Sequence, residues 1–453
     1  MSLLKAPRCL QRSVRIRKVG SKDQNTQRHA LFVAFHFPPE ASSSGVLRTL
    51  KYANYLIESG WRVSVLSVKE DAYEMTDATL TDQVGSHVTL YRTPYINSKT
   101  QLSIKGIYPS ILALPDRWMG WKWWAVPQGV EIYRRDPYDL IYSTSPHATA
   151  HSIASALQKK MAVPWVMDFR DPWYEEPPEP GTPWLVHQYA RKTEARYIQQ
   201  ANAVVSTTNE LSDSFKRRYP QVSEKFCTIY NGYDETDFVH IEQKKEPQSS
   251  TFTMIHAGSV NDNFRDPRPL FDTLGKLINN GKLSAEEIRI EFYGPGQFAH
   301  SDAMAESIRQ NELQSSVSFH ERIPYHEALE KMAKADLLLL LQASEDTRSL
   351  IPAKLFEYLR TQTPVFALVQ SGASSDLITN LSAGWAIDPK DPMALEEAVA
   401  TAIELWRATH LAQNCCELGQ IKQYSRQTLS KQLAQLFDSV VQTYREEVIC
   451  RER

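Results

Sequence analysis

Cysteine is scarce in this chain of 453 residues, which holds only Cys9, Cys227, Cys415, Cys416 and Cys450. Their irregular spacing matches neither a zinc-binding pattern nor the disulfide framework of a small secreted domain. This pattern predicts reduced thiols in a cytoplasmic protein and no metal site.

Long apolar runs and an excess of one charge are also missing. No segment approaches the roughly 18 consecutive apolar residues of a membrane-spanning helix, and the first residues lack the apolar core of a signal peptide. A formal net charge of −2 gives no general attraction for nucleic acid. With 42% apolar and 23% charged residues, the sequence is typical of a globular protein of about two or three domains.

Two segments have an unusual composition. Residues 1–29 carry eight lysines and arginines against the single acid Asp23. They predict a basic, flexible arm suited to peripheral contact with an anionic membrane, although a solvated tail without a specific role has the same composition. Further along, tryptophans are mixed with cations, which is typical either of a membrane interface or sugar platform or of core packing. These tryptophans are Trp118, Trp121, Trp123 and Trp124.

Apolar strand-like runs alternate with helical patterns along the rest of the chain. Residues 31–35 form a strand pattern, residues 45–59 a helical pattern, and residues 62–68 a second strand pattern. Such a βαβ unit predicts a parallel sheet with right-handed crossovers. Further strands are expected at 139–144, 164–169, 203–207, 226–230, 252–256, 288–293, 317–319, 336–341, 365–368 and 385–387.

The polar, patternless residues 239–250 divide this alternation and are interpreted as a linker. The predicted fold class is α/β, with two Rossmann-like doubly wound parallel-sheet domains. These span residues 30–238 and 251–420, and residues 421–453 hold a C-terminal amphipathic helix. Two such domains, joined by one linker, create a cleft between facing carboxyl ends of strands.

The segment from Ile351 to Leu359 has the residues of an anion site. It follows a buried strand, Pro352 suits the first helical turn, and the helix start offers free N–H groups and a positive dipole end. Lys354 adds a positive charge, and Glu357, one turn deeper, is placed to accept hydrogen bonds from a ribose. An ordinary capped helix with a Lys354–Glu357 salt bridge remains the alternative.

Polar residues also follow strands in the N-terminal half. Gly45 and Arg48 begin a helix after a serine-rich loop, which predicts a second anion-binding place or an ordinary cap. Asp168, Arg170 and Asp171 lie at the carboxyl end of a strand, where charges are either functional or paired with one another.

His147 and His151 are four residues apart, as in zinc-binding pairs on helices. No glutamate follows His147, as it would in H-E-x-x-H, and no third ligand is evident. We therefore expect no metal at this pair.

Seven motifs in a fixed order resemble those of the retaining glycosyltransferases of family four, which have the GT-B fold of two facing Rossmann-like domains. The resemblance covers nearly everything after residue 30 and is most similar to bacterial enzymes that assemble surface polysaccharides, such as lipopolysaccharide. The motifs are HFPPEASSSGVLRTLKYANYLIESGW, PDRWMGW, YSTSPHATAH followed by PWVMDFRDPW, YNGYDETDF, HAGSVNDNFRDPRPL, FYGPG and IPAKLFEYL.

In this family the C-terminal domain binds a nucleotide sugar. The resemblance implies that Lys354 and Arg265 contact the diphosphate, that Glu357 holds the ribose and that Gly294 and Gly296 form the turn near the base. The donor-binding residues implied in this way are Gly45, Arg48, Gly258, Arg265, Gly294, Gly296, Ser349, Ile351, Pro352, Lys354 and Glu357.

Two positions depart from the family pattern. Ser349 stands where many members have a glutamate that holds the transferred sugar, and Glu345 or Asp346 is a candidate substitute. Arg170 stands where many relatives have a histidine. The catalytic candidates of the N-terminal domain are therefore His147, Asp168, Arg170 and Asp171.

The implied reaction is transfer of a hexose, with retention, from a nucleoside-diphosphate sugar to a lipid-linked or polysaccharide acceptor at the inner face of the membrane. No cofactor or metal is expected, because helix N-termini and fixed cations stabilise the leaving diphosphate. A nucleotide-sugar epimerase of the same architecture, a relative of phosphorylase or glycogen synthase, and a non-catalytic sugar-nucleotide-binding protein are the alternatives.

Overall fold

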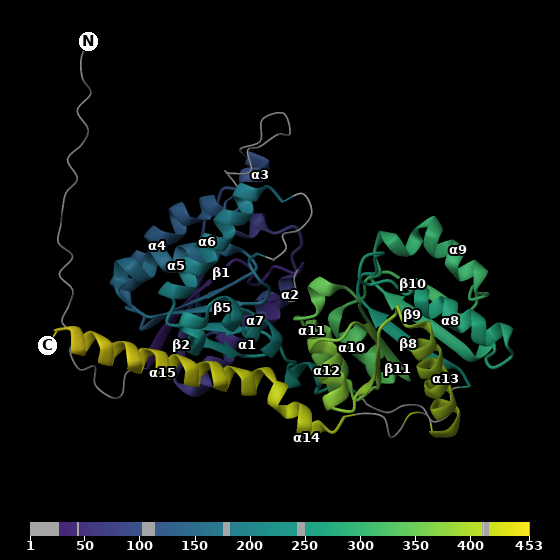
Figure 1. Cartoon of the computed structure of the whole chain (residues 1–453). Helices are drawn as coiled ribbons and strands as arrows, with labels where there is room; N and C mark the ends of the chain where they lie inside the picture. Colours follow the sequence, from purple (N-terminus) through teal and green to yellow (C-terminus); the bar gives the residue numbers. More distant parts are fainter. Residues whose placement is uncertain are drawn as a thin grey trace, which may run out of the picture.

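The structure is a computed structural model that describes residues 27–42, 45–101, 114–174, 182–241, 250–409, 411 and 416–452. Residues 1–26 of the predicted arm and 242–249 of the predicted linker lie outside the described residues. Two domains, each built on a parallel sheet, stand side by side (Figure 1). The predicted α/β class with two Rossmann-like domains is confirmed.

The N-terminal domain contains a seven-stranded sheet in the order β3-β2-β1-β4-β5-β6-β7, and all neighbouring strands run parallel. The edge strand β3 was not predicted, because its side chains are mostly half-buried and show no continuous apolar run. The strands are β1 (Arg28–Ala34), β2 (Trp61–Val68), β3 (Val88–Thr93), β4 (Leu140–Thr144), β5 (Trp165–Phe169), β6 (Ala203–Ser206) and β7 (Phe226–Thr228).

Helices cover both faces of this sheet. Apolar residues of α4, α5, α6 and α7 form one core against the sheet, and α1 packs on the opposite face. The helices are α1 (Gly45–Tyr55), α2 (Ala78–Asp82), α3 (Ser98–Gln101), α4 (Lys122–Arg135), α5 (Ala148–Met161), α6 (Trp184–Gln200) and α7 (Asn209–Arg218).

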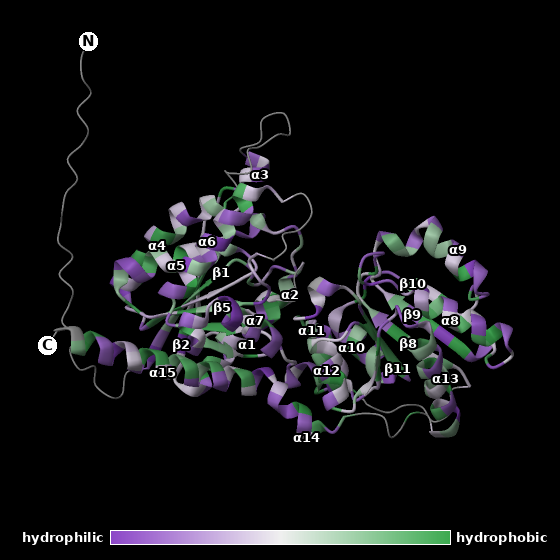
Figure 2. Cartoon of the chain, viewed as in Figure 1, coloured by the Kyte–Doolittle hydropathy of each residue, from purple (hydrophilic) through white to green (hydrophobic). Residues whose placement is uncertain are grey.

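The C-terminal domain has a six-stranded parallel sheet in the order β10-β9-β8-β11-β12-β13. Its strands are β8 (Phe252–Ala257), β9 (Ile288–Tyr293), β10 (Val317–His320), β11 (Leu337–Gln342), β12 (Val365–Val369) and β13 (Gly384–Ile387). Its helices are α8 (Arg268–Asn279), α9 (Asp302–Gln310), α10 (Tyr325–Lys334), α11 (Ala353–Thr361), α12 (Ala373–Asn380), α13 (Pro392–Thr409) and α14 (Leu418–Ile421). Figure 2 shows the strands of both sheets mostly in the green of apolar residues, as expected for sheets covered on both faces.

The last helix, α15 (Arg426–Glu452), returns to the N-terminal domain and runs below it in Figure 1. Its stripe of Leu429, Leu433, Phe437 and Val441 is buried in the core that also contains α1 and one face of the N-terminal sheet. The ring of Phe437 lies 5.3 Å from that of Trp61. The chain therefore crosses between the domains twice, once near residue 240 and once before α15.

The tryptophan-rich segment is partly buried and partly exposed. Trp118 and Trp121 are buried, and the indole N–H of Trp121 donates to Thr93 at 2.8 Å. Trp123 and Trp124 are 66% and 37% exposed on α4. Among the helices that the described residues form, none has the length and apolar character needed to cross a membrane.

Candidate functional site

The carboxyl end of β11 leads into the segment that was predicted to bind an anion. The six residues of β11 are buried, and α11 begins at Ala353 with Pro352 as its N-cap, one residue later than expected. The amide of Gln342 donates to the carbonyls of Thr347 and Leu350, at 3.0 Å each. These bonds fix the segment that precedes α11.

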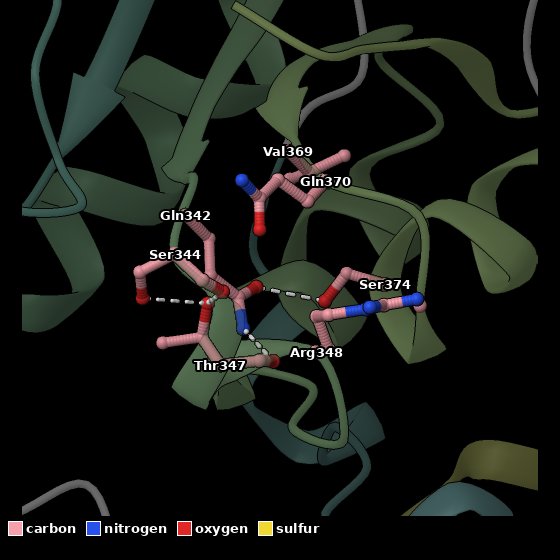
Figure 3. A pocket seen from close by; sticks show the side chains of 8 residues that line it. Gln342, Ser344, Thr347, Arg348, Val369, Gln370 and Ser374 are labelled. Atoms are coloured by element: carbon pink, nitrogen blue, oxygen red, sulfur yellow. Dashed lines mark hydrogen bonds between the residues drawn. The ribbon is translucent and has the colours of Figure 1, made fainter.

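Figure 3 shows the small pocket beside this segment, where Ser374 donates to Gln342 at 2.8 Å. The pocket leaves essentially no volume for even a water molecule. Ligand pockets usually measure about 300–1,000 Å³, so this one is too small for a nucleotide. Its side chains brace the start of α11 and do not form the donor pocket.

Lys354 lies where α11 meets the end of β8. Its Nζ donates to the carbonyl of Ala257 at 2.6 Å. A Cβ on Gly258 would lie 2.6 Å from the same Nζ, and the φ of Gly258 is +125°, a backbone conformation that favours glycine. Burial and, to a smaller extent, the nearby Arg265 lower the pKa of Lys354 to about 7, although Glu357 acts in the opposite direction. The amine is therefore poised to gain a proton when an anion binds.

Arg265 lies on the loop that follows Gly258. The side chain of Asn261 accepts hydrogen bonds from the amides of Asn263, Phe264 and Arg265, which shapes this loop. The Arg265 guanidinium donates to Ser259 at 2.6 Å. Within the described part of the chain, neither Arg265 nor Lys354 is in an ion pair with a carboxylate. Two adjacent cations without a carboxylate, next to a helix N-terminus, have the arrangement expected of an anion site.

Glu357 is 8% exposed and accepts a hydrogen bond from the hydroxyl of Tyr325 at 2.8 Å. Burial raises the pKa of Glu357, while Arg426 and the Tyr325 hydrogen bond act against this rise. The alternative Lys354–Glu357 salt bridge is not formed, because each side chain has another partner. The same hydroxyl lies 3.3 Å from the carboxylate of Asp237 in the N-terminal domain, a contact that no sequence motif indicated.

Gly294 and Gly296 form the turn after β9, with φ of +65° and +79°. The carbonyl of Pro295, between them, accepts from the amide of Val260 at 2.9 Å. The turn therefore supports the loop that carries Gly258 and Arg265.

Ser349 and Ile351 lie where the two domains touch. The carbonyl of Ser349 accepts from the Thr208 hydroxyl at 2.5 Å, and the carbonyl of Ile351 accepts from Asn231 at 3.5 Å. Glu345 pairs with Arg348 at 3.2 Å. The side chain of Asp346, the other candidate substitute, lies outside the described residues.

The side chains of Arg48 and Asp168, which were expected to serve donor binding and catalysis, are buried. They form an ion pair of 2.9 Å with side chains that are 2% and 0% exposed. Burial raises the pKa of Asp168, but Arg48 and Thr144 outweigh this and hold it below its ordinary value. Arg48 also donates to the carbonyl of Tyr230 at 2.5 Å. Arg48 and Asp168 thus form a buried pair that joins α1 to β5.

The other N-terminal candidates gather at the carboxyl edge of the sheet. His147 is the N-cap of α5, and burial lowers its pKa to about 3, so its imidazole is neutral at physiological pH. The guanidinium of Arg170 lies against Gly45, where a Cβ would come within 1.1 Å of it. Asp171 is exposed. His151 hydrogen-bonds to Ser143 in the core at 2.8 Å.

Comparisons with known proteins agree with this arrangement. The family model described as "Glycosyltransferase Family 4" matches residues 46–237, and that described as "Glycosyl transferases group 1" matches residues 272–418. No curated protein sequence matches the chain significantly.

Among solved structures, HepE of Anabaena in complex with UDP and glucose has a TM-score of 0.62 at 17% identity, over 91% of this chain and 100% of that one. A glycosyltransferase of Rickettsia africae has a TM-score of 0.62 at 14% identity, over 92% and 99%. WaaG, a glycosyltransferase of lipopolysaccharide biosynthesis, has a TM-score of 0.56 at 15% identity, over 90% and 99%. The chain therefore matches one glycosyltransferase family model in each of its two parallel-sheet domains, in the order of the GT-B fold that it shares with these solved structures.

Proposed function

We propose that this glycosyltransferase moves a hexose, with retention, from a nucleoside-diphosphate sugar to a lipid-linked or polysaccharide acceptor in bacterial cell-surface polysaccharide biosynthesis. The observation that carries the proposal is the pair of cations Lys354 and Arg265. They lie beside Gly258 and the start of α11, and neither is paired with a carboxylate in the described part of the chain.

In the proposed donor complex, Lys354 and Arg265 hold the diphosphate and stabilise its charge as it leaves, with the first amides of α11 after Ile351 and Pro352. Glu357 exchanges its hydrogen bond from Tyr325 for bonds from the ribose. Gly294 and Gly296 leave room for the base. Because the fixed cations supply the positive charge, no metal or other cofactor is needed.

The N-terminal domain supplies the acceptor side. Its candidates are His147, Arg170 and Asp171, with Gly45 leaving space for the Arg170 guanidinium. Asp168 takes part only through its buried pair with Arg48. Ser349 is a proposed contact of the transferred sugar through the segment that precedes α11.

The direct test is incubation of the protein with a panel of nucleotide sugars, beginning with UDP-glucose because HepE was solved with UDP and glucose. We expect release of nucleoside diphosphate only when bacterial membranes supply an acceptor, no loss with a chelator, and an unchanged anomeric configuration in the product. Turnover without an acceptor would favour the epimerase, and binding without turnover would favour a non-catalytic protein. Loss with chelator that magnesium restores would contradict the metal-free site.

The affinity for the nucleoside diphosphate is expected to fall as the pH rises above about 7. Burial and Arg265 lower the pKa of Lys354 to about 7, so above this pH the free enzyme carries a neutral amine. A diphosphate then binds together with a proton, and its dissociation constant rises by at most about tenfold per pH unit.

Calorimetric titration with UDP in buffers of different ionisation enthalpy measures this proton uptake directly. Lys354→Arg keeps the charge at every pH and is the matched control, for which a flat pH dependence is expected. A wild-type affinity that is independent of pH, without proton uptake, would mean that Lys354 does not contact the anion.

We also propose that the protein is cytoplasmic and associates peripherally with the inner face of the plasma membrane. The exposed indoles of Trp123 and Trp124 lie on α4 next to Lys122. Lys159 and Arg196 are close enough to lower the pKa of Lys122 further, beyond the larger effect of burial. Indoles beside clustered cations suit an anionic lipid surface.

Deletion of residues 1–26 and the substitution Trp123→Ala are each expected to weaken binding to phosphatidylserine vesicles. Each cation lost near the surface contributes on the order of 1 kcal/mol. The deletion stops at residue 26 because Arg28 belongs to β1 and pairs with Asp438 of α15. Met393→Ala, at a side chain 82% exposed on the C-terminal domain, is the control. Unchanged vesicle sedimentation by both variants would end the membrane proposal.

A further inference from the structure

The segment after β1 contains a buried carboxylate that the proposed donor chemistry does not use. Glu40 is 1% exposed, and both of its carboxylate oxygens have hydrogen-bond donors. One oxygen pairs with Nδ1 of His36 at 2.9 Å, and the other accepts from the amide of Ser42 at 2.8 Å and from the Ser42 hydroxyl. The carboxylate is therefore fixed in place and holds the imidazole of His36.

The ring of His36 is fixed on its faces as well. It stacks on the ring of His147 with a centroid distance of 5.1 Å and an interplanar angle of 17°, and Phe35 packs edge-on at 5.2 Å. Its side chain is 13% exposed. Among the described residues, Nε2 of His36 has no hydrogen-bond partner. With the carboxylate as acceptor, Nδ1 carries the hydrogen and Nε2 holds a lone pair that can accept a proton.

This imidazole lies at the edge of the sheet that faces the donor domain. β1, β4 and β5 are neighbours, so His36 after β1, His147 after β4 and Arg170 after β5 share one edge. The same segment touches the C-terminal domain, because Arg322 donates to the carbonyl of Ala41 at 3.5 Å.

Other charged groups also surround the pair. Arg92 of β3 donates to the carbonyl of Pro38, and Arg117 and Arg170 lie near enough to His147 to lower its pKa. Burial and the neighbouring cations keep His147 neutral, with a pKa of about 3, so it supports the His36 ring without competing for a proton at physiological pH.

We propose that His36, oriented by Glu40, binds the acceptor hydroxyl through Nε2 and takes up its proton during transfer. The inference rests on the proposed function and names a further catalytic residue for it. The acceptor oxygen bonds to the anomeric carbon on the face from which the diphosphate departs, which retains the configuration. The bond from that carbon to the diphosphate breaks, and its electron pair leaves with the diphosphate. The acceptor O–H bond breaks as its proton passes to Nε2, and His36 later returns the proton to solvent.

The test compares His36→Ala and Glu40→Gln with a matched pair elsewhere. His326 and Glu330 on α10 are also a histidine and a glutamate four residues apart, at 3.2 Å, but their side chains are 54% and 41% exposed. His326→Ala and Glu330→Gln are therefore expected to behave as the wild type. Sugar transfer to membrane acceptor, donor affinity and thermal unfolding are measured for all four variants.

His36→Ala is expected to slow transfer by about 100-fold or more, the usual contribution of a general base, while the donor dissociation constant stays within about twofold. Imidazole added to His36→Ala should restore part of the rate. Glu40→Gln is expected to slow transfer less and to move the acidic limb of the pH–rate profile. Transfer by His36→Ala at the wild-type rate, or a loss that imidazole does not rescue and that follows donor affinity or thermal unfolding, would overturn the proposal.

Failure of the proposed function gives a different result. In that case the wild type itself releases no nucleoside diphosphate from any donor in the presence of membranes, before any variant is compared. The pairing of His36 with Glu40 is checked independently of activity by nitrogen NMR of the histidine rings. The proposal predicts that the wild type carries its imidazole hydrogen on Nδ1 of His36 and that Glu40→Gln loses the hydrogen from this position. A hydrogen on Nε2 in the wild type would overturn the proposed orientation of the imidazole.

Discussion

Lys354→Ala is expected to lower kcat/KM for the nucleotide sugar by about 100- to 1,000-fold, as removal of one preorganised charge donor from a leaving-group site does in other enzymes. The lysine is held by the Ala257 carbonyl and lies against Gly258, so its amine is directed to one place before the donor arrives. The variant loses this charge where negative charge grows during the reaction.

Nucleoside diphosphate release under steady-state conditions measures the effect. Lys334→Ala, at an exposed lysine near the end of α10, removes the same side chain from the same domain and should leave kcat/KM unchanged. Equal activity of Lys354→Ala and Lys334→Ala would show that the start of α11 does not hold the diphosphate.

Arg48→Met is expected to lower the free energy of unfolding by about 3–5 kcal/mol, because it leaves the buried carboxylate of Asp168 without its cation. Asp168 is 0% exposed, and the hydrogen bond that it accepts from Thr144 at 2.7 Å does not replace a full charge. The double variant Arg48→Met/Asp168→Asn removes both charges and should regain part of the loss.

Urea denaturation measures these differences, and the exposed pair Arg135 and Glu131 is the control. Arg135→Met should leave the denaturation midpoint unchanged, since exposed ion pairs contribute little. If Arg48→Met were as stable as the wild type but bound the nucleotide sugar weakly, this result would indicate that Arg48 contacts the donor.

The sequence predicts the sheets well where burial leaves a strong pattern. The five leucines of β11 place apolar side chains on both faces of the sheet, as a sheet covered by helices on both sides requires. This run can be recognised in the sequence alone. The edge strand β3 has no such run, because solvent reaches many of its side chains. The apolar stripe of α15 predicts that this helix packs against the rest of the protein. Which of the two sheets it covers depends on how the chain crosses between the domains, and no local sequence pattern encodes that crossing.

The site was only partly predictable for a related reason. Helical spacing places Lys354 and Glu357 on one face. In the folded protein, however, Lys354 donates a hydrogen bond to the carbonyl of Ala257, and Glu357 accepts one from Tyr325. Likewise, Arg48 and Asp168 are 120 residues apart in sequence. A charge at the end of a strand has the same sequence pattern whether it binds a ligand or a buried partner, so the two roles could not be distinguished before the fold was known.

The most direct measurement of the donor site compares the wild type with Glu357→Ala at matched thermal stability. If Glu357 holds the ribose, the variant loses charge-assisted hydrogen bonds that contribute about 1.5–3 kcal/mol, or roughly ten- to a hundred-fold in affinity for the nucleotide sugar. The account predicts this loss together with a similar fall in kcat/KM. Wild-type affinity and full activity in Glu357→Ala would contradict the proposed donor site.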